Sequence, residues 1–378
     1  MKKVLILHGF TTEYRIPFLK ELNRILLENN ISMKVVVGQP SKYEKYDKIE
    51  TCDFFIFVRN TYIYFNKSYL IWEPVLSYLK GNDLVIMRQA KRHLVNPFVY
   101  FSCILSNKKT ALWGNMKSYI FKKAGNQIFS LNNKVDHWFA YNDLTKKIVE
   151  SIGFPSEKIT SVHNSIDTKS ERAIYNSITD EEIGILRAKY GIETSDIVGL
   201  FCSRLYSDKR IDFLLHSITK VKEDIPNFKF FVVGDGLEYN KILEFSKMNQ
   251  EWFFAVGAQY GRNKIKYFKL SNFQLIPGLV GLHIVDSFAF ECPIITTINT
   301  FHSVEIDYLK NGENGVMSED SLEEYVNSII NVCKNKKLYE FLKVGCRESA
   351  KLYTIENMAQ RFANGIISCL YEQPNNSL

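Results

Sequence analysis

Two basic residues in a short turn are the first residues of the chain that suit a defined chemistry. Arg204 and Lys209 lie in the stretch CSRLYSDKRIDFLL, residues 202–215, which follows the apolar run IVGLF and opens a helical pattern. The start of a helix offers unpaired backbone N–H groups and the positive end of the helix dipole. An Arg side chain holds two phosphate oxygens in a fork, and a Lys adds a point charge. The stretch predicts a diphosphate site, although two basic residues in a loop are also a common surface feature.

A single acid, Asp286, stands in apolar surroundings further along the chain. It lies within PGLVGLHIVDSFAFECP, residues 277–293. The pattern predicts a strand that ends at the Pro-Gly pair, followed by a helix with an apolar inward face. A carboxylate on the other face can accept hydrogen bonds from the two hydroxyls of a ribose. The alternative is an ordinary exposed helix position.

The glycine fingerprint of dinucleotide-binding enzymes is incomplete. It should follow the first strand, but that strand ends in HGFTTE. The stretch VGDGLE has Gly234 and Gly236 at the required spacing and lacks the third glycine. It predicts a tight turn between a strand and a helix rather than a dehydrogenase site.

Apolar runs of strand length alternate with amphipathic helical patterns. The strands predicted are KVLILHGF, MKVVVGQ, DLVIM and VDHWFAYN, and then IVGLFCSRL, KFFVVGDG, WFFAVGA, FQLIPG and PIITT. This order predicts two doubly wound α/β domains with parallel sheets, residues 1–165 and 166–355, and a final amphipathic helix, residues 356–378. In such sheets ligands bind outside the carboxyl ends of the strands, so the loops after the strands must position any site.

Composition favours a globular protein of a reducing compartment. The 378 residues are 46% hydrophobic and 24% charged. The seven Cys are dispersed, without a CxxC pair or metal-ligand spacing, which predicts free thiols, a cytoplasmic protein and no metal. No apolar run approaches the roughly 18 residues that span a bilayer. The apolar run in MKKVLILHGFTT is too short for a signal peptide and predicts a buried strand.

Basic residues concentrate in the first half of the chain. Residues 1–165 carry 24 Lys/Arg against 13 Asp/Glu, whereas residues 166–378 carry 24 against 28. Within 84–135, nine basic and seven aromatic residues occur without an acid. No nucleic-acid module accompanies them, so the segment predicts attachment to an anionic membrane rather than nucleic acid. The candidate contacts are Lys108, Lys109, Trp113, Lys117, Lys122 and Lys123. The alternative is a solvated basic face.

Five segments in this order resemble the glycosyltransferases of the GT-B fold, specifically glycosyltransferase family 4. They are GFPSEKITSVHNSID (153–167), CSRLYSDKRIDFLL (202–215), FFVVGDG (230–236), PGLVGLHIVDSFAFECPIITT (277–297) and EIDYLKNGENG (305–315). The resemblance covers nearly the whole chain. It implies two Rossmann-like domains that face a central cleft: an N-terminal acceptor-binding domain and a second, nucleotide-sugar-binding domain. It also implies that the C-terminal helix packs back on the first.

The resemblance assigns roles to individual residues. Arg204 and Lys209 match the diphosphate element and would be the catalytic residues, because they would stabilise the departing diphosphate. Asp286 matches the second Glu of the family signature Glu, seven residues, Glu, which binds the ribose hydroxyls. The other donor-site positions are Gly257, Gly278, Gly281, Leu282 and Glu291.

The sequence departs from the family pattern in two places. The first carboxylate of the signature, which would hold the donor sugar, falls on Gly278 and is absent. Glu291, where the family usually has Gly, either compensates for it or ends a helix that faces solvent. In ALWGNMKS, Asn115 stands where relatives often have His. The acceptor-side candidates are therefore His8, Arg88 and Asn115, with His8 alternatively a satisfied histidine at a strand end.

We therefore expect a retaining, metal-independent glycosyltransferase that needs no cofactor. Its donor would be a UDP- or GDP-linked sugar. Its acceptor would be lipid-linked or a glycan of a cell-surface polysaccharide, such as lipopolysaccharide, O-antigen or capsule. We expect it on the inner face of the cytoplasmic membrane, as a peripheral protein. Two alternatives stay open: a nucleotide-sugar epimerase on the same fold, and a catalytically degenerate sugar-nucleotide-binding protein.

Overall fold

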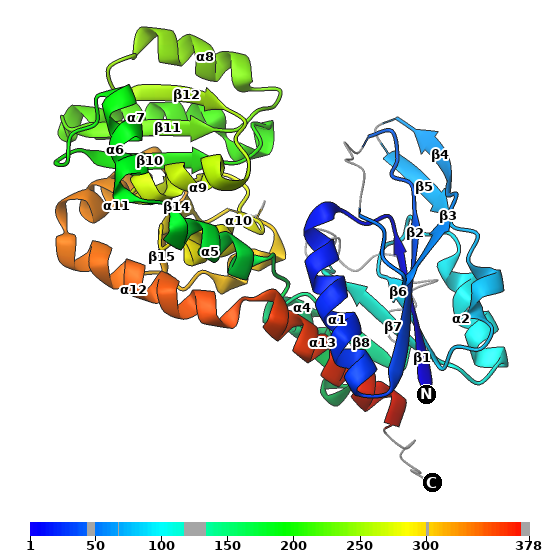
Figure 1. The fold of residues 1–378 in the computed structure, drawn as a ribbon. Helices are drawn as coiled ribbons and strands as arrows, with labels where there is room; N and C mark the ends of the chain where they lie inside the picture. The colour runs from blue at the N-terminus through cyan, green and yellow to red at the C-terminus, as the bar shows by residue number, and fades with distance from the viewer. Residues whose placement is uncertain (44–49, 67, 117–133, 300–301, 372–378) are drawn as a thin grey trace. The chain divides into compact units, whose positions relative to one another are not determined.

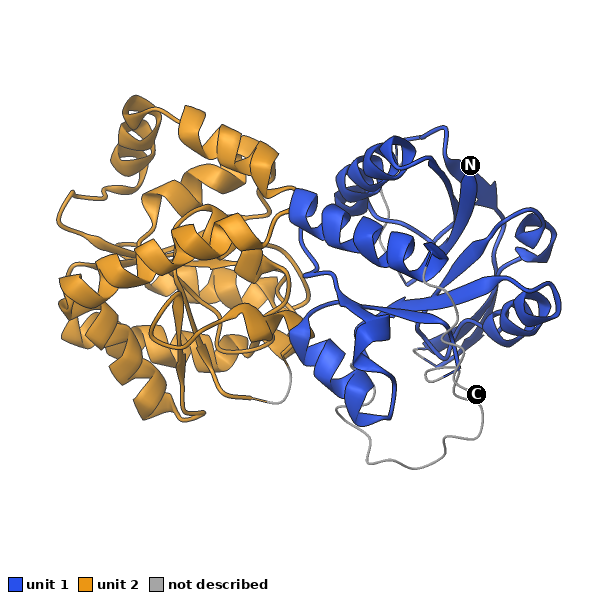
Figure 2. Cartoon of the chain, turned by 90° about the horizontal axis from the view of Figure 1, so that it is seen from below, with its two compact units in different colours: residues 1–166, 355–378 blue, residues 167–354 orange. Residues whose placement is uncertain are grey.

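The chain folds into two compact units, which Figure 2 colours separately. Unit 1 comprises residues 1–166 and 355–378, and unit 2 comprises residues 167–354. The structure, a computed structural model, describes all residues except 44–49, 67, 117–133, 300–301 and 372–378.

Unit 1 is built on a seven-stranded parallel sheet. In their order across the sheet the strands are β3 (Phe55–Val58), β2 (Ile31–Gly38), β1 (Lys2–Gly9), β6 (Leu84–Arg88), β7 (Lys109–Gly114), β8 (His137–Ala140) and β9 (Ile159–Ser161). In β1, Lys2 lies opposite Ile31 of β2, and Val4 lies opposite Leu84 of β6. The strand order reverses between β1 and β6. A doubly wound sheet opens its ligand crevice at such a point.

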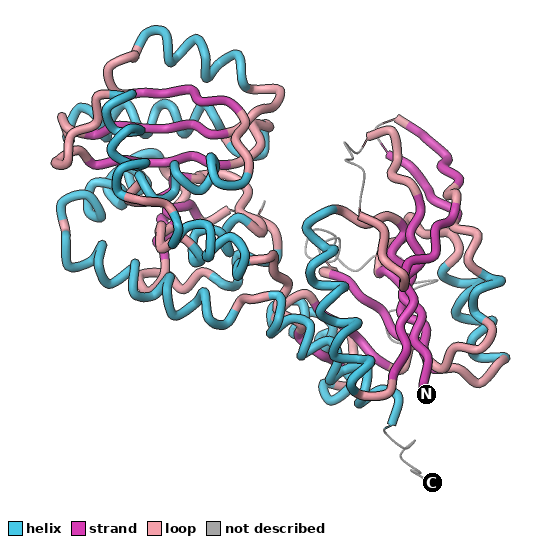
Figure 3. The backbone as a smooth tube through the Cα atoms, in the orientation of Figure 1, coloured by secondary structure: helices cyan, strands magenta, loops and turns pink. Residues whose placement is uncertain are grey.

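Helices cover both faces of this sheet (Figures 1 and 3). The helices and 3-10 turns are η1 (Glu13–Arg15), α1 (Ile16–Glu28), η2 (Leu76–Leu79), α2 (Asn96–Leu105), α4 (Asp143–Ser151), η4 (Ser156–Lys158) and α13 (Ile355–Tyr371). Successive residues of β1 alternate between the two cores, because side chains of a strand point to opposite faces. Val4 and Ile6 pack with α1 and α13, whereas Leu5 and Leu7 pack with α2 and α4.

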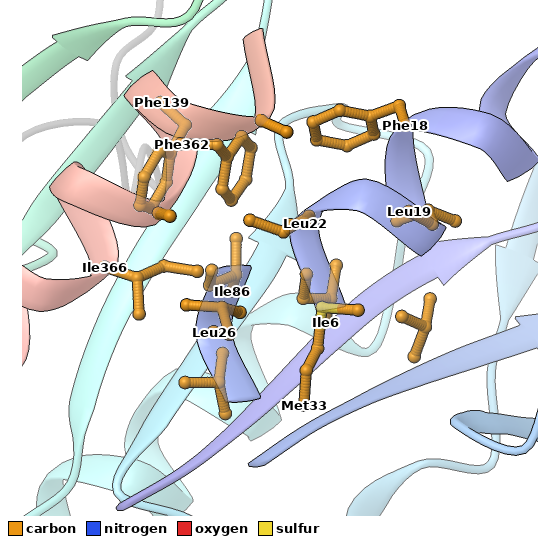
Figure 4. Close-up of a cluster of buried hydrophobic side chains, with 14 of the residues drawn as sticks. Ile6, Phe18, Leu19, Leu22, Leu26, Met33, Ile86, Phe139, Phe362 and Ile366 are labelled. Carbon is orange, nitrogen blue, oxygen red and sulfur yellow. The ribbon is translucent and has the colours of Figure 1, made fainter. Parts of the chain in front are cut away.

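The C-terminal helix completes the core of unit 1, as Figure 4 shows. Phe362 of α13 stacks on Phe139 of β8, with ring centroids 4.1 Å apart, and meets Phe18 of α1 edge-on at 5.6 Å. Gly365 lets the helix approach β9 closely, since an added Cβ would lie 2.5 Å from Thr160 Oγ1. The helix is therefore an integral part of unit 1, although it follows unit 2 in sequence.

A hairpin extends unit 1 beyond its main sheet. Its antiparallel strands β4 (Thr61–Phe65) and β5 (Ser68–Trp72) pair with Thr61 opposite Trp72. The sequence analysis did not predict it, because TYIYF and SYLIW lack the clean alternation of a strand with one buried face.

Unit 2 repeats the architecture with six parallel strands. Across the sheet they are β12 (Phe253–Gly257), β11 (Phe228–Val233), β10 (Ile197–Cys202), β13 (Phe273–Leu275), β14 (Ile294–Thr297) and β15 (Gly315–Ser318). The helices and turns are α5 (Thr168–Ser177), α6 (Asp180–Tyr190), η5 (Ser207–Lys209), α7 (Ile211–Asp224), α8 (Tyr239–Met248), α9 (Gly261–Leu270), α10 (His283–Ala289), η6 (Val304–Tyr308), α11 (Leu322–Lys334) and α12 (Lys336–Leu352). Here the strand order reverses between β10 and β13.

The predicted fold class is confirmed. Both units are doubly wound α/β sheets, and the final amphipathic helix packs in the first. The apolar runs were readable because a parallel sheet covered on both faces buries nearly every residue of its strands.

Candidate active site

Two loops of unit 2 leave the sheet at the point where its strand order reverses. One follows β10 and contains Arg204 and Lys209, and the other follows β13 and contains Gly278. β10 and β13 are paired neighbours, with Gly199 opposite Phe273. The structure thus places the two predicted donor-binding loops at the position where such sheets bind ligands.

Backbone contacts lock the two loops together. The Leu279 N–H donates a hydrogen bond to the Asp208 carbonyl at 2.8 Å. A Cβ added to Gly278 would lie 2.2 Å from that carbonyl oxygen and 2.6 Å from Lys209 Cα. Contacts below 3.0 Å with backbone atoms force the chain to move. Gly278 is therefore required because two backbones approach closely there. The sequence analysis treated the position only as a missing carboxylate and did not predict this steric reason.

A second glycine, Gly236, packs against the start of the basic loop, next to Arg204. A Cβ on Gly236, in the turn after β11, would lie 2.4 Å from the Leu205 carbonyl oxygen. The Leu205 N–H donates to the Asp235 carbonyl at 2.9 Å, and its own carbonyl accepts from Glu238 at 3.0 Å. The stretch VGDGLE is the tight turn that the sequence predicted, and it supports the loop that carries Arg204.

The two basic side chains of the loop differ in exposure. Lys209 is 5% exposed and donates to the Leu279 carbonyl, whereas Arg204 is exposed. His283 lies near Lys209. Burial, and then the Lys209 charge, hold the pKa of His283 well below its usual range. Its Nε2 is buried and has no hydrogen-bond partner among the described residues. Lys209 thus provides a fixed positive charge beside a neutral imidazole, while Arg204 reaches solvent.

His302 fixes the loop after β13 from its other side. The Val280 N–H donates to His302 Nδ1 at 3.0 Å, so the proton is on Nε2, which donates to the Thr297 carbonyl at 2.7 Å. The Thr297 hydroxyl donates to the Pro277 carbonyl at 2.9 Å. These bonds hold the backbone around Gly278 in place, and no sequence motif reveals them.

Asp286 belongs to a cluster of three charged side chains. The Lys264 ammonium lies 2.9 Å from Glu171 Oε1 and 3.4 Å from both carboxylate oxygens of Asp286. The three side chains come from α5, α9 and α10, and each is at least half buried. Cys202, the last residue of β10, is beside them, and burial raises the pKa of its thiol to about 12. The sequence analysis found Asp286 and missed its two partners.

One cation and two carboxyl groups would give this buried cluster a net negative charge if both acids were ionised. Burial, and then the Asp286 charge, raise the pKa of Glu171 to about 8, while Lys264 opposes the shift. At neutral pH the neutralising proton is therefore on Glu171. The Asp286 carboxylate keeps lone pairs that the long contacts to Lys264 do not use.

The protonation of Glu171 predicts how the free energy of unfolding depends on pH. The pKa of Glu171 rises from 4.5 to about 8 on folding, so the folded protein binds a proton that the unfolded chain has released. The free energy of unfolding should fall as the pH rises from about 4.5 to about 8. Glu171→Gln, which imitates the protonated acid, should flatten that slope and stabilise the protein above about pH 8. Urea unfolding across this range measures it; Glu193→Gln, in an exposed turn, is the control. Parallel pH profiles of wild type and Glu171→Gln would contradict the assignment.

Glu291 is held by two arginines rather than presented to a ligand. Arg172 binds one carboxylate oxygen and Arg347 the other at 2.6 Å. Burial opposes ionisation, but the two arginines lower the pKa of Glu291 to about 2. The residue has a left-handed backbone with φ of 53° just after α10. Both oxygens are engaged in unit 2 itself, so we leave Glu291 outside the site that we propose.

The remaining predicted donor positions are backbone positions. Gly257 ends β12 with φ of 79°, which favours glycine. Gly281 and Leu282 lie directly before α10, and a Cβ on Gly281 would meet nothing closer than 3.7 Å. Their contribution to donor binding stays a prediction.

The acceptor-side candidates lie at three adjacent strand ends of unit 1. His8 is in β1, Arg88 ends β6, and Asn115 follows β7. The Arg88 guanidinium donates to the His8 carbonyl at 3.4 Å. His8 Nδ1 lies 2.7 Å from the Phe10 carbonyl. Burial, followed by Arg88 and Arg15, lowers the pKa of His8 to about 3, so its imidazole is neutral.

A buried pair that the sequence analysis missed lies beside them. His93 Nδ1 is 2.7 Å from Glu73 Oε2, and both side chains are 3% exposed. A Cβ on Gly9, the last residue of β1, would lie 2.9 Å from His93 Cε1. The pair thus packs against Gly9 at the carboxyl end of β1. The residues are 20 apart in sequence, and neither stands in a motif.

Comparison with solved structures supports the fold. The crystal structure of Anabaena Alr3699/HepE in complex with UDP superposes with a TM-score of 0.64, covering 97% of this chain and 100% of that chain. The sequences are 14% identical. Likeness at this identity concerns the fold alone.

A family model decides what the second unit is. Residues 182–347 match the model described as glycosyl transferases group 1. Unit 2 is a group 1 glycosyltransferase domain. The matched range of the group 1 domain contains Arg204, Lys209, Gly278 and Asp286, whereas Glu171 precedes it. Membership of family 4 specifically stays a prediction.

Two curated relatives of this chain are named as glycolipid synthases. Alpha-monoglucosyldiacylglycerol synthase of Acholeplasma laidlawii is 24% identical over 191 residues, 49% of this chain and 47% of that protein. Alpha-galactosylglucosyldiacylglycerol synthase of Streptococcus pneumoniae is 21% identical over 263 residues, 66% of each. The aligned parts thus span about half to two thirds of the relatives' length.

The described residues contain neither a metal-ligand cluster nor a membrane-spanning helix. In this part of the chain, no group of three or more His, Cys, Asp or Glu side chains is placed to hold a metal ion. Metal independence stays a prediction. No described helix has the length and apolar character needed to cross a bilayer.

Proposed function

We propose that this protein is a glycosyltransferase that moves a sugar from a UDP- or GDP-linked donor to a lipid acceptor. The basic loop of the group 1 domain carries the proposal. It holds Lys209 fixed, presents Arg204 and is locked on both sides by glycine-dependent backbone contacts. The acceptor oxygen would bond to the anomeric carbon on the face from which the diphosphate departs, the bond from that carbon to the diphosphate would break, and the acceptor's hydroxyl proton would pass to the departing diphosphate oxygen. Arg204, Lys209 and the start of α7 would stabilise the charge on the departing diphosphate. By family resemblance, the configuration would be retained.

The names of the relatives favour a glycolipid acceptor. Both are named as synthases of glycosylated diacylglycerols. We therefore propose an acceptor with a diacylglycerol or similar lipid anchor. A lipid-linked glycan of a surface polysaccharide is the second candidate. His8, Arg88 and Asn115 would face the acceptor. An acceptor of this kind stays in a bilayer, so we also propose peripheral attachment to the inner face of the cytoplasmic membrane.

Two other functions predict different products. An epimerase would convert a labelled donor into a new nucleotide sugar without transfer. A degenerate binding protein would bind donor and leave it intact, whereas a transferase without acceptor hydrolyses it slowly. Diacylglycerol, monoglucosyldiacylglycerol and polyprenyl-phosphate-linked sugars, each with labelled UDP- and GDP-sugars, separate these cases. A labelled lipid product supports the proposal, and a labelled nucleotide product alone contradicts it. A thermal-shift screen against nucleotides identifies the base first, because a ligand at 100 times its Kd adds about 2.7 kcal/mol of stability.

The ribose contact predicts a selective loss of affinity. Asp286→Ala should weaken nucleoside diphosphate binding by about 1–3 kcal/mol, because the ribose hydroxyls lose their acceptor. A 2′,3′-dideoxy nucleotide should bind wild type and variant alike. Calorimetric titration of both ligands measures this, with Glu244→Ala, an exposed acid of α8, as the control. An equal loss for both ligands would show that Asp286 acts only through Lys264 and Glu171.

A further inference from the structure

The outward face of α2 is unusually apolar for a surface helix. The helix, NPFVYFSCIL, has no charged residue. Its inward side chains Val99 and Cys103 are 0% exposed, as the core requires. The outward side chains are apolar as well: Phe98 is 56% exposed, Phe101 58% and Leu105 88%. A helix that is apolar on all sides is normally covered on all sides, and within unit 1 nothing described covers this face.

The apolar face continues onto the hairpin. Trp72 of β5 contacts Phe98 with ring centroids 5.5 Å apart. The Ile71 N–H donates to the Arg92 carbonyl, and Ile71 accepts from Leu94, so the hairpin is joined to the segment before α2. On the hairpin itself Ile63 and Phe65 are also about half exposed. The α2 face and the hairpin are thus one connected apolar surface, and Figure 1 shows both on unit 1.

Exposed cations lie next to this surface in the sequence: Arg59 precedes the hairpin, and Lys91 precedes α2. Arg92 lies over the Tyr69 ring at 4.7 Å, and Lys42 lies over the Tyr64 ring at 4.3 Å. Residues 54–72 contain no acid, and neither do residues 84–135. Of the two acids between these segments, Glu73 is buried against His93 and Asp83 is paired with Lys2 at 2.9 Å. Tyr64 and Tyr69 lie on the opposite face of the hairpin from Ile63 and Phe65, so the exposed cations, and not these rings, would bind anionic lipid.

We propose that the outward face of α2 and the β4–β5 hairpin dock on an anionic lipid bilayer, with Phe98, Phe101 and Leu105 inserted. A second copy of the chain fits less well, because the exposed cations Arg59 and Lys91 would meet their own charge. This inference rests on the proposed function for the identity of the acceptor, and it adds the surface that reaches it. The connection from β6 to α2 starts at Arg88, whose carbonyl accepts from Asn96 at 2.9 Å, so the docked face begins beside the acceptor candidates.

The docking surface differs from the contacts that the basic and aromatic residues of 84–135 predicted. Trp113 is 3% exposed and packs on Phe18 and Phe362 in the core, so its expected role at the membrane is wrong. Lys108 donates to the Leu79 carbonyl, and Lys109 lies 3.6 Å from Asp136. Lys117, Lys122 and Lys123 lie outside the described residues.

The test is co-sedimentation of the full chain with vesicles of phosphatidylcholine, with and without phosphatidylglycerol. Phe98→Gln/Phe101→Gln/Leu105→Gln should bind anionic vesicles at least about tenfold more weakly than wild type, because three side chains lose their transfer from water to lipid. The matched control is Ile185→Gln/Met248→Gln/Phe341→Gln, which removes three comparably exposed apolar side chains, 57–75% exposed, from unit 2. It should bind like wild type. Melting temperatures verify folding.

A second readout locates the contact. Trp113, Trp138 and Trp252 are at most 8% exposed, so brominated lipid should quench Trp72 selectively. Trp72→Phe should abolish the quenching. Equal pelleting of triple variant and control would overturn the proposal. So would a concentration-dependent dimer in sedimentation velocity that the triple variant abolishes while vesicle binding persists. Nucleotide binding, followed by thermal shift, should be the same in all variants. If wild type bound no nucleotide, the proposed function would be refuted, whereas the docking result would stand.

Discussion

Changing Arg204 or Lys209 to Ala is expected to lower kcat by about 10²-fold or more. The charge on the diphosphate increases as the sugar–phosphate bond breaks, so groups fixed at that position stabilise the transition state more than the bound donor. Lys209 is such a group, since it is buried and its ammonium is held by the Leu279 carbonyl. Donor KM should change less than kcat. Steady-state transfer assays with a lipid acceptor measure both parameters.

Two controls make this result interpretable. Lys209→Met keeps the apolar stem and removes only the charge, so it separates lost catalysis from a cavity under the loop. Lys247→Ala, an exposed change in α8, should leave kcat unchanged. Normal turnover in both Arg204→Ala and Lys209→Met would remove the diphosphate assignment and the mechanism built on it.

The sequence was sufficient to locate the donor loops, for a physical reason. Parallel strands buried on both faces form continuous apolar runs such as IVGLF, and their carboxyl ends follow directly. The position of Arg204 after β10 and of Gly278 after β13 could therefore be predicted. The strand order, which makes β10 and β13 neighbours, comes from the tertiary structure and was not predicted.

The partners of the site residues could not be predicted. Glu171 and Lys264 lie 93 residues apart in sequence, on two different helices, and only packing brings them to Asp286. In the same way, Arg172 and Arg347 lie 119 and 56 residues from Glu291. A charge pattern along one helix gives no sign of such pairs. Likewise, the basic and aromatic residues of 84–135 suggested a membrane contact, but burial decided which of them reach the surface.

Restoring the missing carboxylate is expected to destroy activity rather than improve it. Gly278→Glu would complete the family signature, with Asp286 as its second acid. However, the added Cβ would lie 2.2 Å from the Asp208 carbonyl oxygen and 2.6 Å from Lys209 Cα, both backbone atoms. The two loops would have to separate, which breaks the bond from Leu279 to Asp208 and displaces Lys209. We expect a loss of about 10²-fold or more in kcat, as for Lys209→Ala.

Alanine substitutions in the same loop isolate the cause. Gly278→Ala adds only the Cβ, so it should show a similar loss and a destabilisation of about 1–3 kcal/mol from overpacking. Gly281→Ala is the matched control, because its nearest contact would be Ser303 Cβ at 3.7 Å, an ordinary van der Waals distance. It should retain the wild-type melting temperature, while Lys247→Ala remains the control for turnover. Transfer assays and thermal melting of the three variants decide the point. If Gly278→Glu transferred sugar as well as wild type, the locked loops would not be the basis of the site. If Gly278→Ala were silent and Gly278→Glu inactive, the carboxylate charge rather than the backbone contact would be what the site excludes.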